Sequence, residues 1–294
     1  MKKLLLCGIL GILSQQLIAE PILKVININQ ELEMENENGK QDFDDVWLWN
    51  KVNLTYGDWI FGLTAGKDWA IDLGDDGAHS KTGRVQLNAS KKINKDLILG
   101  VAWRMEDTLD KYYGNWTYDD GVFWSYGEYW YEAQNSTNTS NPDSINIETI
   151  PLGFKYGAFK IAYYLGYYNM LGTIPTNGKE SELEHQIRLF ADLYKDEKWS
   201  ISTEARFTFH HSFNYNEDST PYRKYKDFGR TRLYLYTSYK ASENLTLYGR
   251  YGYEWRNWSY ENGDKRENYG DFLTSKGHAA ENYQNFAIGW IYTF

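Results

Sequence analysis

Charged residues recur at every second position in several stretches of the chain. Glu106 follows Arg104 at this spacing, and Arg206 follows Glu204. Residues two apart lie on one face of a β-strand, so these pairs would give a strand a charged face. The planar guanidinium of Arg can bind carboxylates or phosphates, and nearby carboxylates can also pair with it. The chemistry on offer is therefore reversible binding of small charged or polar solutes, or ion pairing within the fold.

A second group of residues includes His, Ser and Asp, which are residue types found in hydrolytic sites. His210-His211-Ser212 would place a His and a Ser on one strand face, where a base could activate a nucleophile. The element resembles outer-membrane phospholipases only in its His-x-Ser spacing, because the Asn-Gly that follows in that family is absent. Asp75-Asp76 near His79, and Asp119-Asp120, imitate parts of an outer-membrane aspartyl protease. Such groups are common in solvated loops, so we predict that the chain is not an enzyme.

The sequence offers no strong metal site. No His and Cys residues have the spacing of a zinc centre. Asp72, Asp75 and Asp76 could bind Ca²⁺ weakly, but they lack the regular ligand spacing of an EF-hand loop. We predict neither a metal nor another cofactor.

The elements that must position the alternating charges are strands, and the last ten residues show this most clearly. One face carries Phe286, Ile288, Trp290, Tyr292 and Phe294, while the other face is smaller and more polar. A terminal strand with such a face fits a closed transmembrane barrel, whose outer surface meets lipid; an edge strand of a sandwich is the alternative. The terminal Phe294 resembles the C-terminal signature of Gram-negative outer-membrane barrels. That resemblance implies recognition by the barrel-assembly machinery.

The other end of the chain looks like an export signal. Met1-Lys2-Lys3 is positively charged, Leu4 to Leu13 is apolar, and Ala19 offers a small residue before Glu20. We predict a secretory signal peptide over residues 1–19 and a barrel over residues 20–294. Cys7, the only Cys, lies in the apolar run, so the mature chain would contain no disulfide.

Composition excludes several other classes of protein. The formal charge of −9 argues against a nucleic-acid partner. The mean hydropathy of −0.66 is too polar for a bundle of membrane helices, and 17% aromatic residues are too many for a disordered chain. A barrel reconciles the two values, because only one face of each strand needs to be apolar.

Alternating segments along the chain predict an all-β, antiparallel, up-and-down transmembrane barrel of about twelve strands. Short turns, such as Tyr56-Gly57-Asp58, alternate with longer connections, as in outer-membrane barrels. Gly114 to Pro142 is the longest irregular stretch, although Val122 to Glu132 within it is dense in Trp and Tyr. That segment could extend neighbouring strands, fold into the pore, or form its own hairpin. A hairpin would raise the count to fourteen.

If the apolar faces meet lipid and lipopolysaccharide, the charged faces line the interior. A charge on the lipid face would cost roughly 2–4 kcal/mol near the midplane. Both signs are interleaved, which predicts weak ion selectivity. Two interpretations of the Arg residues remain open: a track for acidic sugars, or pairs with Glu across strands that hold the barrel in shape. The predicted pore-lining residues are Lys51, Arg84, Arg104, Glu106, Glu182, Glu184, Arg188, Glu204, Arg206, Arg232, Arg250, Glu254 and Arg256.

Several segments carry a family resemblance. They are Ile26-Asn27-Ile28, Tyr248 to Gly252, Trp255 to Tyr260 and Ile288 to Phe294. In these the chain resembles the monomeric outer-membrane porins typified by outer-membrane protein G, and more distantly the twelve-stranded oligogalacturonate-specific porins. The resemblance implies a monomeric passive channel for mono- and oligosaccharides. The pH-gating His pair of that family has no counterpart that we can place, so gating is not implied.

Taken together, the patterns predict a porin in the outer membrane of a Gram-negative bacterium. It would pass small hydrophilic solutes such as sugars and ions by diffusion, without catalysis. A channel tuned to acidic oligosaccharides is one alternative, and a plugged structural or adhesin barrel is another. Either Val122 to Glu132 or the long charged loop Ser259 to Glu281, which corresponds in position to a lid-like loop of the resembled family, could occlude the pore.

Overall fold

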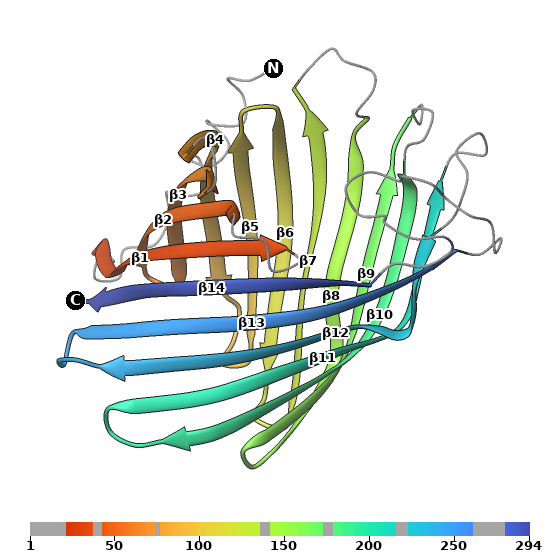
Figure 1. The fold of residues 1–294 in the computed structure, drawn as a ribbon. Coiled ribbons are helices and arrows are strands. Elements are labelled where there is room, and N and C mark those ends of the chain that lie inside the picture. Colours follow the sequence, from red (N-terminus) through yellow and green to blue (C-terminus); the bar gives the residue numbers. More distant parts are fainter. Residues whose placement is uncertain are drawn as a thin grey trace.

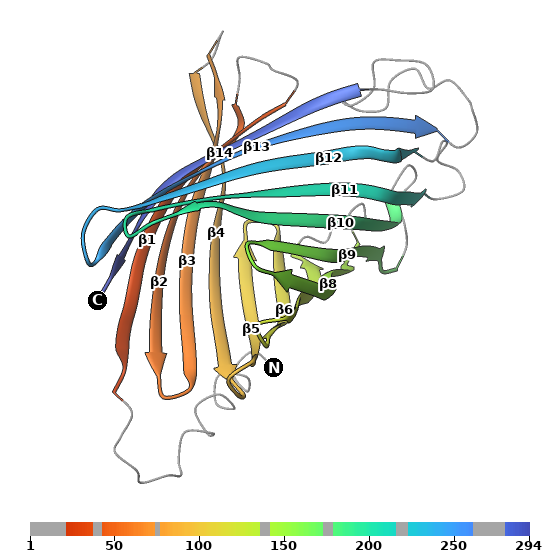
Figure 2. The ribbon, with the colours of Figure 1, turned by 90° about the horizontal axis from the view of Figure 1, so that it is seen from below.

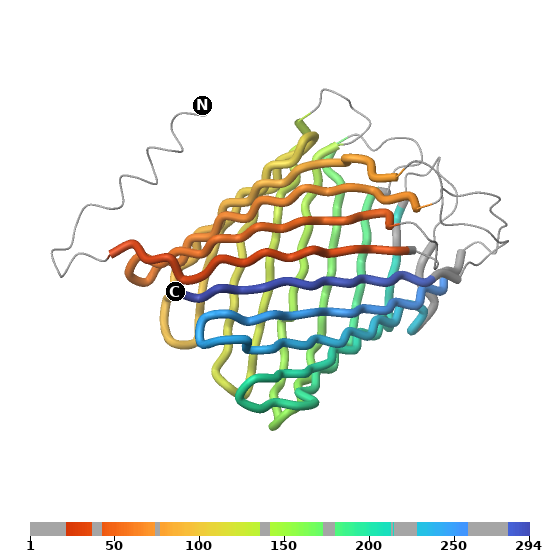
Figure 3. The backbone as a smooth tube through the Cα atoms, turned by 60° about the vertical axis from the view of Figure 1, so that its left-hand side comes forward, coloured from red at the N-terminus to blue at the C-terminus, as the bar shows by residue number. Residues whose placement is uncertain are grey.

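The chain folds into a single closed β-barrel (Figure 1). The computed structural model describes residues 22–37, 43–73, 77–135, 142–172, 179–215, 223–260 and 280–294. Each strand pairs antiparallel with its neighbours in the sequence, and β1 pairs with β14 to close the barrel (Figure 3). The strands are β1 (Lys24–Glu37), β2 (Phe43–Tyr56), β3 (Trp59–Asp72), β4 (Gly77–Lys92), β5 (Leu97–Glu106), β6 (Leu109–Asp119), β7 (Phe123–Gln134), β8 (Ser144–Tyr156), β9 (Phe159–Met170), β10 (Lys179–Lys195), β11 (Trp199–Tyr215), β12 (Arg223–Lys240), β13 (Leu245–Tyr260) and β14 (Ala280–Thr293).

The outer face of the barrel is apolar. Large hydrophobic side chains lie on it with much of their surface exposed, among them Val101 at 60% and Ile288 at 59%. Their neighbours in sequence point inwards and are small, polar or charged on most strands, which is the alternation of a membrane barrel. No helix among the described residues is long and apolar enough to cross a membrane. A closed antiparallel barrel with such an exterior is the architecture of outer-membrane proteins.

The barrel has fourteen strands rather than the twelve of the main sequence prediction, and fourteen was the stated alternative. Alternation continues from Leu97 to Lys111, but this stretch belongs to two strands, because β5 ends at Glu106 and β6 begins at Leu109. Val122 to Glu132 lies mostly in β7, a wall strand, and not in an occluding loop. β6 and β7 were missed because their inner faces carry large aromatics such as Tyr113 and Trp130. With aromatics on both faces, hydrophobicity does not alternate.

The turns after β2, β4, β6, β8, β10 and β12 are short and lie at one end of the barrel, and several are held by the same kind of hydrogen bond. Asn94, Asp120 and Asp196 each accept two backbone N–H bonds from residues two and three positions later, at 2.6–2.9 Å. This side-chain turn holds the chain reversal without relying on Gly. The backbone bond from Val122 is the main reason why the pKa of Asp120 lies below its ordinary value, and the bond from Trp199 acts likewise on the pKa of Asp196.

These two turns predict a specific pH dependence. A carboxyl with a lowered native pKa stabilises the fold fully above its unfolded pKa of about 3.9, and this contribution is lost as the pH falls through the native pKa. Between pH 6 and pH 3 the melting temperature of the wild type should therefore fall more than that of Asp120→Asn/Asp196→Asn, in which the amides keep the same bonds. Asn94→Ala is the control, because it should lower the melting temperature without changing this pH slope. Equal slopes in the wild type and the double variant would contradict the prediction.

The wall of the barrel is uneven in length (Figures 1 and 2). β10 to β13 contain 16–18 residues each, whereas β5 to β7 contain 10–12. β8 is irregular as expected for a strand that contains Pro151, and its register with both neighbours shifts there. The long wall therefore presents more inward positions than the short wall, and most of the inward arginines lie on it.

Candidate functional site in the barrel interior

The inner face of the long wall is organised around one buried carboxylate, that of Glu254. Its side chain is 2% exposed, and it contacts the guanidinium groups of three arginines. Arg230 and Arg256 donate through Nε at 3.0 and 2.5 Å, and Arg232 forms an ion pair through its Nε. Arg230 and Arg232 come from β12, whereas Arg256 lies two residues from Glu254 on β13. A single carboxylate thus fixes three cationic side chains from two strands.

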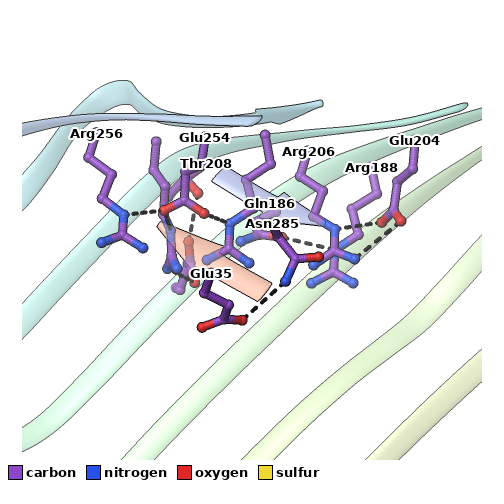
Figure 4. A network of polar contacts seen from close by, with 12 residues as sticks. Glu35, Gln186, Arg188, Glu204, Arg206, Thr208, Glu254, Arg256 and Asn285 are labelled. Atoms are coloured by element: carbon purple, nitrogen blue, oxygen red, sulfur yellow. Dashed lines mark hydrogen bonds and ion pairs between the residues drawn. The ribbon is translucent and has the colours of Figure 1, made fainter. Parts of the chain in front are cut away.

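The network continues across β11 and β10 (Figure 4). Arg230 donates through Nη1 to Glu184 at 3.0 Å, and Glu184 accepts a bond of 2.6 Å from Thr208. Arg206 donates through Nε and Nη2 to Glu204 at 2.6 and 3.1 Å. These pairs form both across strands and between residues two apart on one strand. Pairing with Glu, one of the two interpretations of the sequence, is therefore present in the fold.

A second cluster joins the long wall to β14 and β1. Arg250 donates through Nε to Asn285 at 2.8 Å and through Nη2 to Glu33 at 2.5 Å. Asn285 also donates to Glu35 at 3.1 Å, which is the contact drawn in Figure 4. This cluster crosses the pairing between β1 and β14, which closes the barrel. Interior hydrogen bonds and an ion pair therefore join the strands on the two sides of the closure.

Aromatic rings support several of these guanidinium groups. Arg188 lies 3.7 Å from the ring centre of Tyr164, and Arg206 lies 4.7 Å from that of Tyr234. Stacking of this kind favours Arg over Lys. Tyr234 in turn lies across Gly252 of β13, where an added Cβ would come within 2.5 Å of the ring. Gly252 is needed because only the absence of a side chain lets the ring lie flat beneath Arg206.

The opposite wall carries alternating aromatic and cationic residues. Trp47 and Trp49 stack at 4.4 Å, and the guanidinium of Arg84 lies 4.2 Å from the ring centre of Trp47. Arg84 pairs with Glu106 at 3.0 Å, which also lies 3.8 Å from Arg104. Trp47 is only 6% exposed. This side of the interior is therefore packed with side chains.

A small apolar core lies inside the barrel on β7 to β10. Ile150, Ala162 and Tyr164 are buried together, and Trp124 and Phe190 pack against them. Trp124 and Phe190 meet edge to face at 5.6 Å. Trp124 is the second residue of β7, so this core sits close to the end of the barrel that carries the short turns. It fills interior volume on that side.

Removing part of this core should widen the interior. We expect Trp124→Ala/Phe190→Ala to raise single-channel conductance, at a stability cost of a few kcal/mol from lost packing. Phe123→Ala is the matched control, since Phe123 is adjacent in sequence but points outwards against Phe154. Its conductance should equal that of the wild type. Equal conductance in all three proteins would show that the core does not limit the pore.

Three cavities follow the long wall of the interior. The first has a volume of about 190 Å³ and is lined by Glu184, Arg188 and Arg230 among others. The second, of about 460 Å³, shares Arg206 and Arg232 with it. The third, of about 310 Å³, shares Tyr236 and Arg250 with the second. Neighbouring cavities therefore share arginine side chains, and the three together are lined by residues of β7 to β14 and of β1.

That the charged residues of the sequence analysis line a pore stays a prediction. Most of these residues take part in the contacts above; Glu182 contacts His211 at 2.9 Å, and Lys51 lies in register with Asn29 and Thr64. The sequence analysis did not select several residues that complete the networks or line the cavities. These are Glu33, Glu35, Tyr164, Thr208, Arg230, Tyr234, Tyr236, Tyr283 and Asn285. Arg230 lies two residues before Arg232, so the alternation that selected Arg232 also indicates Arg230.

Of the groups considered for hydrolysis, His210 and the pair Asp119 and Asp120 lie in different parts of the barrel, on β11 and at the end of β6, and do not contact each other in the described part of the chain. His210 lies on the outer face of β11, with its ring 5.4 Å from that of His185. Asp119 and Asp120 close the turn between β6 and β7. Asp75 and Asp76 lie outside the described residues, as do the signal peptide and most of the loop from Ser259 to Glu281. Among the residues that the structure describes, no three His, Cys, Asp or Glu side chains form a metal cluster.

Comparison with known proteins adds little. No protein-family model and no curated protein matches the chain. Solved structures that align with it include OccK3 (OpdO) of Pseudomonas aeruginosa (TM-score 0.44, 7% identity, 91% of this chain and 95% of the other) and OmpT of Vibrio cholerae (0.45, 12%, 96% and 100%). A bacterial polysaccharide outer-membrane secretin gives 0.48, 8%, 94% and 100%. The resemblance to protein G porins therefore stays an expectation.

Proposed function

We propose that this barrel is a porin of the outer membrane, which passes small hydrophilic solutes such as sugars and ions by diffusion. The observation that carries the proposal is a row of three interior cavities, each of which shares arginine side chains with the next. The row is lined by Arg, Glu, Tyr and Ser side chains, which can replace the hydration of a polar solute. A barrel of this size lies between small filled barrels and wide general pores, so a narrow path along one wall is expected.

The geometry also bears on how solutes would move. Arg206, Arg232 and Arg250 mark the junctions between cavities, and each is held through its Nε by a side-chain oxygen. Cationic groups that are fixed at successive positions can bind an anionic solute one after another as it moves through the channel. Glu33 and Glu35 line the second cavity as well, so cations are not excluded. The wild type should therefore be only weakly ion-selective.

A second candidate is a channel for acidic oligosaccharides. It is favoured by the combination of four arginines with Tyr234, Tyr236 and Tyr283 in the second cavity. Arginine binds carboxylates, and a tyrosine offers both a flat ring and a hydroxyl to a sugar. A plugged adhesin would need none of these groups to line an interior cavity.

Solute flux into vesicles tests the proposal. The mature chain is refolded into liposomes, and swelling is followed in a neutral pentose, a neutral disaccharide and an acidic disaccharide. Swelling in the pentose above that of empty liposomes is expected, with slower entry of the disaccharide. Faster entry of the acidic than of the neutral disaccharide would favour the second candidate. No swelling from a folded barrel would overturn both and favour a plugged barrel.

A further inference from the structure

Three side chains with polar groups, Trp290, Gln30 and Asn50, form a row on the outer face of the barrel, where apolar side chains are expected. Trp290 of β14 donates through Nε1 to Gln30 of β1 at 3.4 Å, and Gln30 donates through Nε2 to Asn50 of β2 at 2.9 Å. The sequence neighbours of these residues point inwards: Asn29 bonds to Tyr248 at 3.1 Å, and Trp49 to Glu33 at 3.1 Å. Because side chains alternate along a strand, the row itself faces outwards.

The row lies at the centre of the lipid-facing surface. On β1, Gln30 is the middle of five outward residues, with Ile26 and Ile28 on one side and Leu32 and Met34 on the other. On β2, Asn50 lies between the outward residues Leu48 and Val52. Trp290 holds the same position on β14. Gln30 is in register with Trp290 and with Asn50, so three adjacent strands (Figure 3) place polar groups side by side, midway along their outward-facing residues.

The amide groups in this row have unused hydrogen-bonding capacity. Asn50 is exposed, and its Oδ1 accepts the bond from Gln30. No residue in the described parts of the chain accepts a bond from its Nδ2. Hydrocarbon supplies neither donor nor acceptor, so such a group is costly when it faces lipid. An amide that faces a second protein can be satisfied, and polar side chains hold transmembrane elements together in this way.

We propose that the face formed by β14, β1 and β2 docks against the same face of a second copy of this chain, with Gln30 and Asn50 at the contact. Amides carry both donors and acceptors, so they are complementary to themselves across a symmetry axis. No charged side chain takes part in the row, so no partner of opposite charge is needed. Ala65, the β3 residue in register with Asn50, is small and lets another surface approach closely. This inference replaces the monomer that the family resemblance implies.

Disulfide crosslinking in a lipid bilayer tests the contact. The only Cys of the chain is Cys7, ahead of the mature barrel, so each variant carries a single Cys. Gln30→Cys and Asn50→Cys are made separately, purified, placed in liposomes and oxidised. Leu189→Cys is the matched control, because Leu189 is 41% exposed on the outer face of β10, across the barrel from β1 and β2.

The expected result is a disulfide-linked dimer for at least one of the two test variants, several-fold above the level of Leu189→Cys. If neither exceeds the control, the proposal is overturned. The mass of the unmodified protein in lipid nanodiscs gives a second measurement that needs no Cys. Wild type should be an oligomer and Gln30→Leu/Asn50→Leu should shift towards monomer; a monomeric wild type would overturn the proposal. Each copy keeps its own lumen, so solute flux tests the proposed channel separately.

Discussion

Replacing Arg206, Arg232 and Arg250 by Gln is expected to convert a weakly selective channel into a cation-selective one. The three arginines each line two neighbouring cavities. Their removal leaves the second cavity with Glu33, Glu35 and a single arginine, Arg256. A unit charge about 7 Å from a permeating ion contributes roughly 0.6 kcal/mol in water. Three such charges change the cation-to-anion permeability ratio by roughly 10-fold once screening at 0.1 M salt is included.

Reversal potentials across a planar bilayer under a salt gradient measure this ratio. The control replaces Lys95, Lys195 and Lys198 by Gln, because these residues are exposed at the short-turn end of the barrel and carry the same total charge. The control should keep the wild-type ratio, and the effect of the lumen variant should shrink at 1 M salt, where the Debye length is about 3 Å. A lumen variant that behaves like the control would show that ions do not pass along this wall.

Replacing Glu254 by Gln should give the largest loss of stability of any single polar substitution in the interior. The carboxylate is held by three guanidinium groups and is nearly inaccessible to water. Without its charge, Arg230, Arg232 and Arg256 repel one another in a crowded site. Breaking a buried charge pair by removing one partner costs about 3–5 kcal/mol, and we expect about 3 kcal/mol because the lumen admits some water.

Urea unfolding in lipid vesicles, followed by tryptophan fluorescence, measures this loss. Glu204→Gln is the matched control, since Glu204 is also buried but holds one arginine, Arg206, together with the hydroxyl of Tyr236. Its loss should be about 1–2 kcal/mol. Equal losses in the two variants would mean that Glu254 is not the centre of the network.

The fold could be predicted from the sequence where the two faces of a strand differ sharply. β12 is such a strand, because Leu233 and Leu235 alternate with Arg232 and Tyr234. The prediction failed for β6 and β7, whose inner faces are aromatic. The apolar alternation also continues from β5 into β6, because the turn after Glu106 is too short to interrupt it. Alternation reports a difference in polarity between faces, and aromatic residues on both faces remove that difference.

The charged interior could be predicted as a set but not as an arrangement. Alternation places Arg206, Arg232 and Glu254 on one side of their strands, but it does not show that Arg232 reaches Glu254 on the next strand. That contact depends on the register between β12 and β13. The apolar core around Ile150 depends on the irregularity at Pro151, which shifts the register of β8. Register is set by pairing over the whole barrel, so no single segment encodes it.

Single-channel recording of the refolded mature chain in a planar bilayer tests the central claim most directly. An open path through the three cavities predicts stable, ohmic current steps in symmetrical salt. The reversal potential under a salt gradient should lie near zero, because Arg and Glu side chains line the same cavities. A protein that folds, as judged by strong β circular dichroism, but passes no current would contradict the claim and indicate a plugged barrel.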